Sequence, residues 1–132
     1  MKALNILLVD DDSDDQMIFI DAIKEIDHSI QCHVVGNGLE ALLSLRTKSP
    51  STDIIFLDLN MPKMNGYECL EEIKKEKHLK EIPVVIYTTS KLEAEKERTL
   101  QMGAKHFLIK PSDFSLLIKE LSRILNLELK QD

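Results

Sequence analysis

The chain has 132 residues, of which 43% are hydrophobic and 30% are charged, so it is long enough for one compact domain and too hydrophobic for an intrinsically disordered protein. Its 17 basic and 23 acidic residues give a net charge of −6, and such an acidic surface repels nucleic acids and anionic membranes. No apolar run approaches the roughly 18 residues of a membrane span, and the start MKALNILLVDDD lacks the features of an export signal, so we expect a cytoplasmic protein.

Five short runs of β-forming residues alternate with helical patterns along the chain. In chain order, the runs are NILLV (5–9), IQCHVV (30–35), DIIFLD (53–58), PVVIY (83–87) and HFLI (106–109). The third and fourth runs are continuously apolar, which is typical of strands buried on both faces, whereas the second is mixed and suits a sheet edge. The pattern predicts an α/β fold of the (βα)5 type, in which helices cover both faces of a parallel five-stranded sheet.

Four predicted helices begin with a polar residue that can accept a hydrogen bond from a free backbone N–H, followed three residues later by Glu or Gln. The pairs are Ser13 with Gln16, Asn37 with Glu40, Asn65 with Glu68, and Ser90 with Glu93, and the fifth helix should begin at Ser112 or Asp113. Gly103 should end the fourth helix in a left-handed conformation. We expect one domain over residues 1–132, with a core over about residues 4–125 and a short tail over 126–132.

The residues that follow the strands carry the strongest functional signal. Ligands of parallel α/β sheets bind beyond the carboxyl ends of the strands, so residues at those ends should meet at one edge of the sheet. The ends of the first, third, fourth and fifth runs supply Asp10, Asp11, Asp12, Asp58, Thr88, Thr89 and Lys110. This set predicts an acidic cleft that also holds a hydroxyl and a lysine.

Carboxylates packed this closely favour a bound cation. Two like charges about 4 Å apart repel by roughly 4 kcal/mol at an effective dielectric constant near 20. Oxygen ligands without His or Cys select a hard ion, and an incomplete protein cage suits Mg²⁺, so we expect Mg²⁺ at Asp10, Asp11 and Asp58. Asp14 and Asp15 should instead be solvated residues of a helix start, favoured there by the helix dipole.

Four segments, ILLVDDD, FLDLNMPKMNGYECL, PVVIYTTS and GAKHFLIKP, resemble in order and spacing the receiver domain of two-component response regulators. The resemblance covers about residues 4–125 and is closest to stand-alone receivers of the kind paired with phytochrome-type histidine kinases. It implies a flavodoxin-like three-layer sandwich with strand order 2-1-3-4-5. It also implies a signalling protein that accepts a phosphoryl group, not a turnover enzyme.

The resemblance implies a role for each residue of the cleft. Asp58 would accept a phosphoryl group from the phosphohistidine of a histidine kinase or a histidine phosphotransfer protein. Asp11, Asp58 and the backbone carbonyl of Asn60 would bind Mg²⁺, with Asp10 acting directly or through water. Lys110 would pair with a phosphoryl oxygen.

The resemblance also implies a switch and a control of phosphoryl lifetime. Thr88 would move toward the phosphoryl group and vacate space into which Phe107 turns. Asn60 and Ser90 would line the route of the hydrolytic water. Thr89 is larger than the residue common at its position in the family, so we expect it to narrow the access to Asp58.

Output should come from contact with another protein. We expect a downstream partner, or a second copy of the chain, to dock on the fourth helix, the fifth strand and the fifth helix. The last helical segment holds more apolar residues than one buried stripe requires. Leu125, Leu127 and Leu129 alternate with polar residues beyond the expected domain edge and would pack on a symmetric neighbour.

Two other functions explain part of the pattern. A phosphatase of the haloacid dehalogenase type would use Asp10 and Asp12 as nucleophile and acid, but this hypothesis leaves Asp58 and the segment LNMP unexplained and the chain has no room for the usual cap domain. A receiver that works only as an unphosphorylated interaction module has usually lost the acidic pair, the phosphoacceptor or the lysine. All of these are present here.

Overall fold

The computed structural model describes residues 4–47 and 51–129, and within them five strands form one parallel sheet. The strands are β1 (Asn5–Val9), β2 (Gln31–Val35), β3 (Ile54–Leu57), β4 (Val84–Thr88) and β5 (His106–Ile109). Their order is β2-β1-β3-β4-β5, which confirms the order that the family resemblance implied. All residues of β3 and β4 are buried, whereas β2 lies at an edge and is partly exposed, as the sequence predicted.

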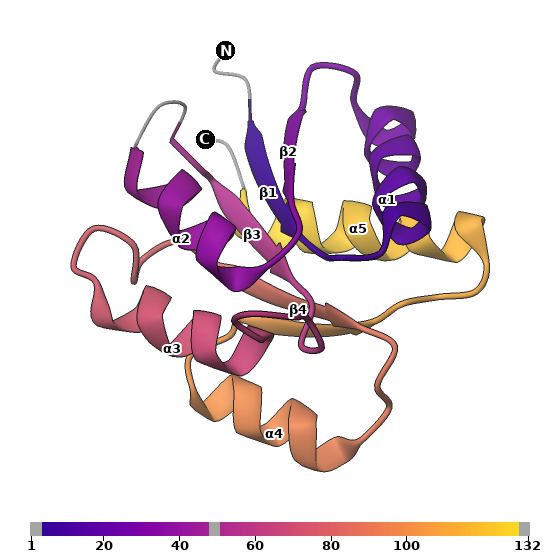
Figure 1. Cartoon of the computed structure of the whole chain (residues 1–132). Coiled ribbons are helices and arrows are strands. Elements are labelled where there is room, and N and C mark those ends of the chain that lie inside the picture. The colour runs from indigo at the N-terminus through magenta and orange to yellow at the C-terminus, as the bar shows by residue number, and fades with distance from the viewer. Residues whose placement is uncertain (1–3, 48–50, 130–132) are drawn as a thin grey trace.

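Five helices cover the two faces of this sheet (Figure 1). Helices α1 (Ser13–Ile26) and α5 (Phe114–Glu128) pack on one face, and α2 (Gly38–Thr47), α3 (Gly66–Lys75) and α4 (Glu93–Gln101) lie on the other. Alternate strand residues serve the two layers, because successive side chains of a strand point to opposite faces. In β1, for example, Ile6 and Leu8 pack against α1 and α5, and Leu7 and Val9 pack on the opposite face. The three-layer sandwich is therefore confirmed.

Three of the predicted helix starts are confirmed. Asn65 and Glu68 form a reciprocal capping box at the start of α3. Asn37 Oδ1 accepts from the Glu40 N–H at 3.0 Å before α2. Asp113 Oδ1 accepts from the Ser115 N–H at 2.8 Å at the start of α5. Such contacts satisfy backbone donors that have no partner within the helix.

The other two predicted starts were wrong in detail. Asp12, not Ser13, caps α1, because its carboxylate is the stronger acceptor and takes the Asp15 N–H at 3.0 Å. Helix α4 begins at Glu93 after Leu92, and the Ser90 hydroxyl accepts from the Leu92 N–H within the preceding loop.

The end of the chain also differs from the sequence prediction. Helix α5 continues to Glu128, so the tail expected from residue 126 is helical at its start, and residues 130–132 lie outside the described residues. Leu125 is buried and Leu129 packs against the α1–α5 core, and His106 Nε2 lies 2.7 Å from Glu128 Oε2. These contacts hold the last turn, so of the three leucines expected to pack on a symmetric neighbour only Leu127, at 57% exposure, remains available.

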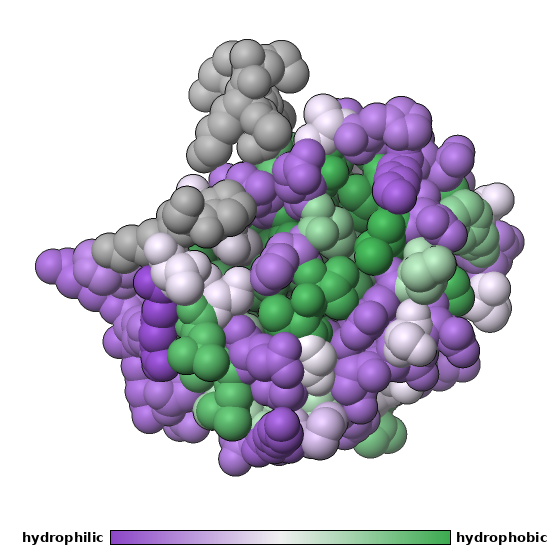
Figure 2. Space-filling view, turned by 45° about the horizontal axis from the view of Figure 1, so that its top comes forward, coloured by the Kyte–Doolittle hydropathy of each residue, from purple (hydrophilic) through white to green (hydrophobic). Residues whose placement is uncertain are grey.

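A cavity of about 620 Å³ lies at the amino end of the strands, between β1, β2 and α2. Asn5, His33, Leu43 and Ser44 are among its lining residues. Figure 2 brings this end of the sheet forward and shows hydrophobic residues in the middle of the face with hydrophilic residues around them. The cavity lies at the opposite end of the strands from Asp58. No helix within the described residues is long and apolar enough to cross a membrane.

Candidate functional site

The residues that follow β1, β3 and β5 meet the last residue of β4 at the carboxyl end of the sheet (Figure 1). Asp10 follows β1 and is fully buried, and Asp58 follows β3 with 8% of its surface exposed. Thr88 ends β4 and is buried, and Lys110 follows β5. The Lys110 N–H donates to the Thr88 carbonyl at 2.7 Å, which ties two of these ends together. The structure therefore brings together strand-end residues that lie far apart in the sequence.

The Lys110 ammonium lies among three carboxylates. Its Nζ atom is 2.7 Å from Asp15 Oδ2, 2.8 Å from Asp10 Oδ2 and 3.4 Å from Asp58 Oδ2. Only 9% of the Lys110 side chain is exposed, so water screens these ion pairs less than it screens pairs on a surface.

Asp15 belongs to the site, although its place in an acidic helix start predicted a solvated residue. The prediction holds for Asp14, which is exposed, and was wrong for Asp15. Only three residues separate β1 from helix α1, so the first turn of the helix stays near the strand ends and Asp15 reaches Lys110. No spacing along the chain signals this contact, because the two residues are 95 positions apart.

The protonation equilibria of the site reflect its burial. Desolvation raises the pKa of the Asp10 and Asp58 carboxyls above the ordinary value, because burial penalises their charged forms, and Lys110 opposes this shift only in part. Burial lowers the pKa of Lys110, but hydrogen bonds with Asp10 and Asp15 outweigh it and the pKa is raised. The ammonium therefore stays charged, and the buried carboxylates would be stabilised by a further cation.

Three carboxylates form a suitable set of metal ligands. Asp10, Asp11 and Asp58 each offer one oxygen, and these oxygens lie within 4.8 Å of one another. Backbone donors orient two of the carboxylates: the Asp12 N–H donates to Asp10 Oδ1 at 3.0 Å, and the Leu59 N–H donates to Asp58 Oδ1 at 2.8 Å. An all-oxygen set with one exposed member fits Mg²⁺, which keeps part of its water shell.

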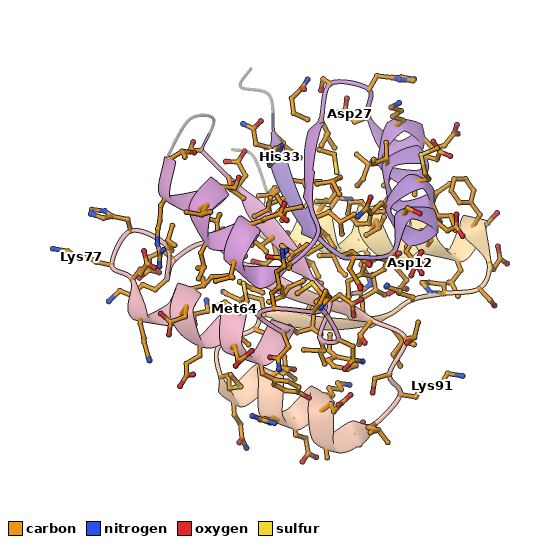
Figure 3. The ribbon with its side chains drawn as sticks, in the orientation of Figure 1. Asp12, Asp27, His33, Met64, Lys77 and Lys91 are labelled. Atoms are coloured by element: carbon orange, nitrogen blue, oxygen red, sulfur yellow. The ribbon has the colours of Figure 1, made fainter. Side chains whose placement is uncertain are left out.

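The loop after β3 carries Asn60, whose backbone carbonyl the family resemblance names as a metal ligand. Gly66 closes this loop and leaves no room for a side chain, since a Cβ atom there would lie 2.2 Å from the Asp58 carbonyl oxygen. On the other side of the loop lies Met64 (Figure 3), whose carbonyl accepts from the Gly38 N–H at 3.1 Å. These contacts tie the loop to Asp58 and to the start of α2, and Asn60 is exposed between them.

Thr88 has a hydroxyl inside the site. Its Oγ1 atom accepts from the Ser90 N–H at 3.2 Å, and the hydroxyl can still donate to an incoming oxygen. Ser90 itself is partly exposed in the loop that follows, and Thr89 is exposed.

Two aromatic residues near the site face opposite layers. Phe107 is half-buried and packs against the core that lies under α2 and α3. Tyr87 is buried with Phe19 and Phe56 under α1 and α5, and Lys110 Nζ lies 5.2 Å from the centroid of the Tyr87 ring. At this distance the ring contributes a favourable cation–π interaction.

The phosphatase hypothesis needs Asp12 as a general acid. Asp12 is instead an exposed cap of α1, and its Oδ1 atom accepts from the Asp15 N–H (Figure 3). The hypothesis also assigns no role to Asp58, whose carboxylate lies near both Lys110 and the carboxylates of Asp10 and Asp11. Neither the position of Asp12 nor that of Asp58 supports a phosphatase.

Comparison with known proteins agrees with this geometry. The family model of the response regulator receiver domain matches residues 6–122. Response regulator Rcp1 of Synechocystis is 35% identical over 126 residues, which cover 90% of this chain and 84% of Rcp1. Two-component response regulator ORR5 of rice (Oryza sativa subsp. japonica) is 35% identical over 123 residues, which cover 93% of this chain and 90% of ORR5.

Solved structures give the same result. The phosphorylated cyanobacterial phytochrome response regulator RcpA superposes with a TM-score of 0.88 at 30% identity, covering 98% of this chain and 96% of RcpA. The Mn²⁺-bound form of Rcp1 superposes with a TM-score of 0.80 at 32% identity, with the same coverage of the two chains.

Proposed function

This chain belongs to the response regulator receiver domain family, and on that premise we propose that it accepts a phosphoryl group on Asp58 from a phosphohistidine in a Mg²⁺-dependent reaction. The donor would be a histidine kinase or a histidine phosphotransfer protein. The observation that carries the proposal is the position of Asp58, whose carboxylate lies 3.4 Å from the Lys110 ammonium and within 4.8 Å of a carboxylate oxygen of both Asp10 and Asp11.

The chemistry is a displacement at phosphorus. A carboxylate oxygen of Asp58 forms a bond to phosphorus, and the bond from phosphorus to the donor imidazole nitrogen breaks, so this nitrogen leaves with the electron pair. Lys110 neutralises charge on a phosphoryl oxygen, and the Thr88 hydroxyl donates a hydrogen bond to another. Both groups already lie at the carboxyl end of the sheet, so little reorganisation is needed.

Asp10, Asp11, Asp58 and the Asn60 carbonyl would hold the metal ion. When bound, Mg²⁺ supplies positive charge that neutralises phosphoryl oxygens. The donor set supports this assignment because its three carboxylates contain oxygen ligands only and include two buried groups whose pKa is raised by desolvation.

The signal would leave the site through Thr88 and Phe107. A cavity of about 510 Å³ is lined by both Phe107 and Lys110, so the proposed switch residue and the lysine of the site border the same hollow. Leu116 of α5 lines the same cavity and is 46% exposed. A shift of Phe107 would therefore change the surface formed by α4, β5 and α5.

This surface is the proposed docking face for a downstream protein or for a second copy of the chain. We expect Leu116→Ser to weaken phosphorylation-dependent association, and Leu43→Ser, on the exposed face of α2, to leave it unchanged. Light scattering at tens of micromolar protein, with and without a beryllofluoride mimic, measures self-association. A monomer under both conditions would leave docking to another protein.

Asn60 and Ser90 are the residues proposed to control the phosphoryl lifetime. Both lie in loops next to the site, two residues beyond Asp58 and Thr88 respectively. Substitution of either should change the rate of dephosphorylation more than the rate of phosphorylation. Equal effects on the two rates would exclude this role.

The main experiment is labelling by acetyl phosphate with Mg²⁺. Intact mass should show one added phosphoryl group, and the signal should vanish in Asp58→Asn or after metal removal. If the wild-type protein takes no phosphoryl group from acetyl phosphate or from a phosphohistidine, the interaction-module hypothesis replaces the proposal. If Asp58→Asn is labelled as strongly as the wild type, the assignment of Asp58 is wrong.

A further inference from the structure

Asp15 has no part in the proposed chemistry, although its carboxylate makes the shortest contact of the Lys110 ammonium. An ammonium has three N–H donors and no acceptor. Two short contacts, of 2.7 Å to Asp15 and 2.8 Å to Asp10, use two of these donors. The third contact, to Asp58 Oδ2, is longer at 3.4 Å.

The two carboxylates that hold Lys110 belong to one hydrogen-bonded loop. The Asp12 N–H donates to Asp10 Oδ1 at 3.0 Å, and the Asp12 carboxylate accepts from the Asp15 N–H at 3.0 Å. Asp10 therefore approaches Lys110 from the end of β1 and Asp15 from the first turn of α1, with Asp12 linking them. Two anchors from two elements restrict the rotation of the ammonium more than one anchor would.

We propose that Asp15 is a positioning residue that keeps the Lys110 ammonium from closing on Asp58. The remaining N–H of the ammonium still points toward the Asp58 carboxylate. Without Asp15, the ammonium is free to close the 3.4 Å separation and form a tight ion pair with Asp58. Such a pair would mask the attacking oxygen and compete with a metal ion for the same carboxylate. The inference rests on the proposed role of Asp58.

The chain offers a matched control for this contact. Asp14 and Asp15 are neighbours in the first turn of α1, so Asp14→Asn and Asp15→Asn remove the same charge from the same helix start. Asp14 is exposed, and the ion pairs of Lys110 within the described residues are those with Asp10, Asp15 and Asp58. A difference between the two variants therefore reports the contact and not the net charge.

The first measurement is a titration with beryllofluoride at fixed Mg²⁺, followed by NMR. Asp15→Asn should raise the concentration for half-saturation about three- to tenfold, the loss expected for one charge-assisted hydrogen bond at a partly exposed site. Asp14→Asn should change it less than about twofold, and Asp15→Glu, which keeps the charge, should fall between Asp15→Asn and the wild type.

The second measurement needs neither metal nor beryllofluoride. Exchange of the Lys110 ammonium hydrogens with water, followed by NMR, should be faster in Asp15→Asn than in the wild type and in Asp14→Asn. Equal behaviour of Asp15→Asn and Asp14→Asn in either measurement would overturn the inference. Tighter beryllofluoride binding by Asp15→Asn would also overturn it, because Asp15 would then compete with the phosphoryl group for Lys110. If the wild type binds no beryllofluoride, the proposed function fails, and the exchange rates still decide whether Asp15 holds the ammonium.

Discussion

Asp58→Asn should stabilise the fold at pH 7 in the absence of divalent metal. The substitution keeps the shape of the side chain and removes one of the charges that crowd the carboxyl end of the sheet. In the wild type, Asp58 is repelled by Asp10 and Asp11, whose nearest ligand oxygens lie within 4.8 Å of it, and attracted by Lys110 at 3.4 Å.

Charge pairs and desolvation together set the size of the effect. At an effective dielectric constant of about 20, a repulsive pair at 4.8 Å costs about 3.5 kcal/mol and the attraction to Lys110 at 3.4 Å is worth about 5 kcal/mol, so the charge pairs largely cancel and the loss of solvation on burial decides against the charged carboxylate. Asp11 is exposed, so solvent screens its share. We therefore expect a gain of about 1 kcal/mol, or about 4 °C in Tm for a chain of this length.

The pH dependence follows from the direction of the pKa shift. Burial raises the pKa of Asp58 in the native state, so the wild type loses stability as the pH rises through that raised value. The advantage of Asp58→Asn should be largest at neutral pH and should shrink as the pH falls toward the ordinary value of 3.8, because the wild-type carboxyl then becomes protonated. Thermal unfolding with EDTA, over a series of pH values, measures both effects.

Magnesium provides the second arm of the same experiment. Mg²⁺ should stabilise the wild type more than Asp58→Asn, because the variant lacks one of the proposed metal ligands and an ion that binds the native state stabilises it by mass action. A variant that is less stable than the wild type at neutral pH without metal would refute the reasoning. It would show that the ion pair between Asp58 and Lys110 outweighs the repulsion from the other carboxylates.

Three further predictions test the core, the loop and the switch. Phe56→Ala should lower the free energy of unfolding by about 3–5 kcal/mol in urea titrations, because Phe56 is fully buried and packs edge-on against the ring of Phe19 at a centroid distance of 5.0 Å. Gly66→Ala should lower the free energy of unfolding by more than about 2 kcal/mol in the same assay, since its Cβ would meet the Asp58 carbonyl. Gly36→Ala is the control: no atom lies within 4 Å of a Cβ there, so the free energy of unfolding should change by less than about 1 kcal/mol. Thr88→Ala should still take a phosphoryl group from acetyl phosphate, but the NMR signals around the Phe107 ring should not shift. Signals that shift as in the wild type would exclude the Thr88 hydroxyl as the trigger.

The sequence predicted the part of the candidate site that lies at the ends of the strands. Asp10, Asp58, Thr88 and Lys110 follow or end strands, and a parallel sheet places such residues side by side whatever the details of packing. Asp15 could not be found in this way, because it lies in the first turn of α1 and reaches Lys110 only once that helix is packed on the sheet. A run of acidic residues at a helix start looks the same in the sequence whether or not one member turns inward.

The end of α5 shows the same division between local and distant contacts. Alternating leucines beyond residue 125 read as a separate tail, because no local pattern records a partner for them. In the structure, Leu129 packs against the core and Glu128 lies 2.7 Å from His106, so the helix gains one more turn than its own sequence predicts. This contact joins residues 22 positions apart and depends on how β5 and α5 pack.

The sequence by itself determined the order of strands and helices along the chain and the buried strands of the sheet, because hydrophobic periodicity and capping residues act over a few neighbouring positions. It also determined the acidic edge with its lysine, because the carboxyl ends of parallel strands meet at one edge of the sheet. The tertiary structure alone decided that Lys110 has Asp15 as its shortest partner, that Tyr87 and Phe107 face opposite layers, and that α5 runs to Glu128. The layer that an aromatic side chain faces follows from the register of its strand. The other two features depend on how the helices pack on the sheet, which many side chains decide together and no short stretch of the chain contains.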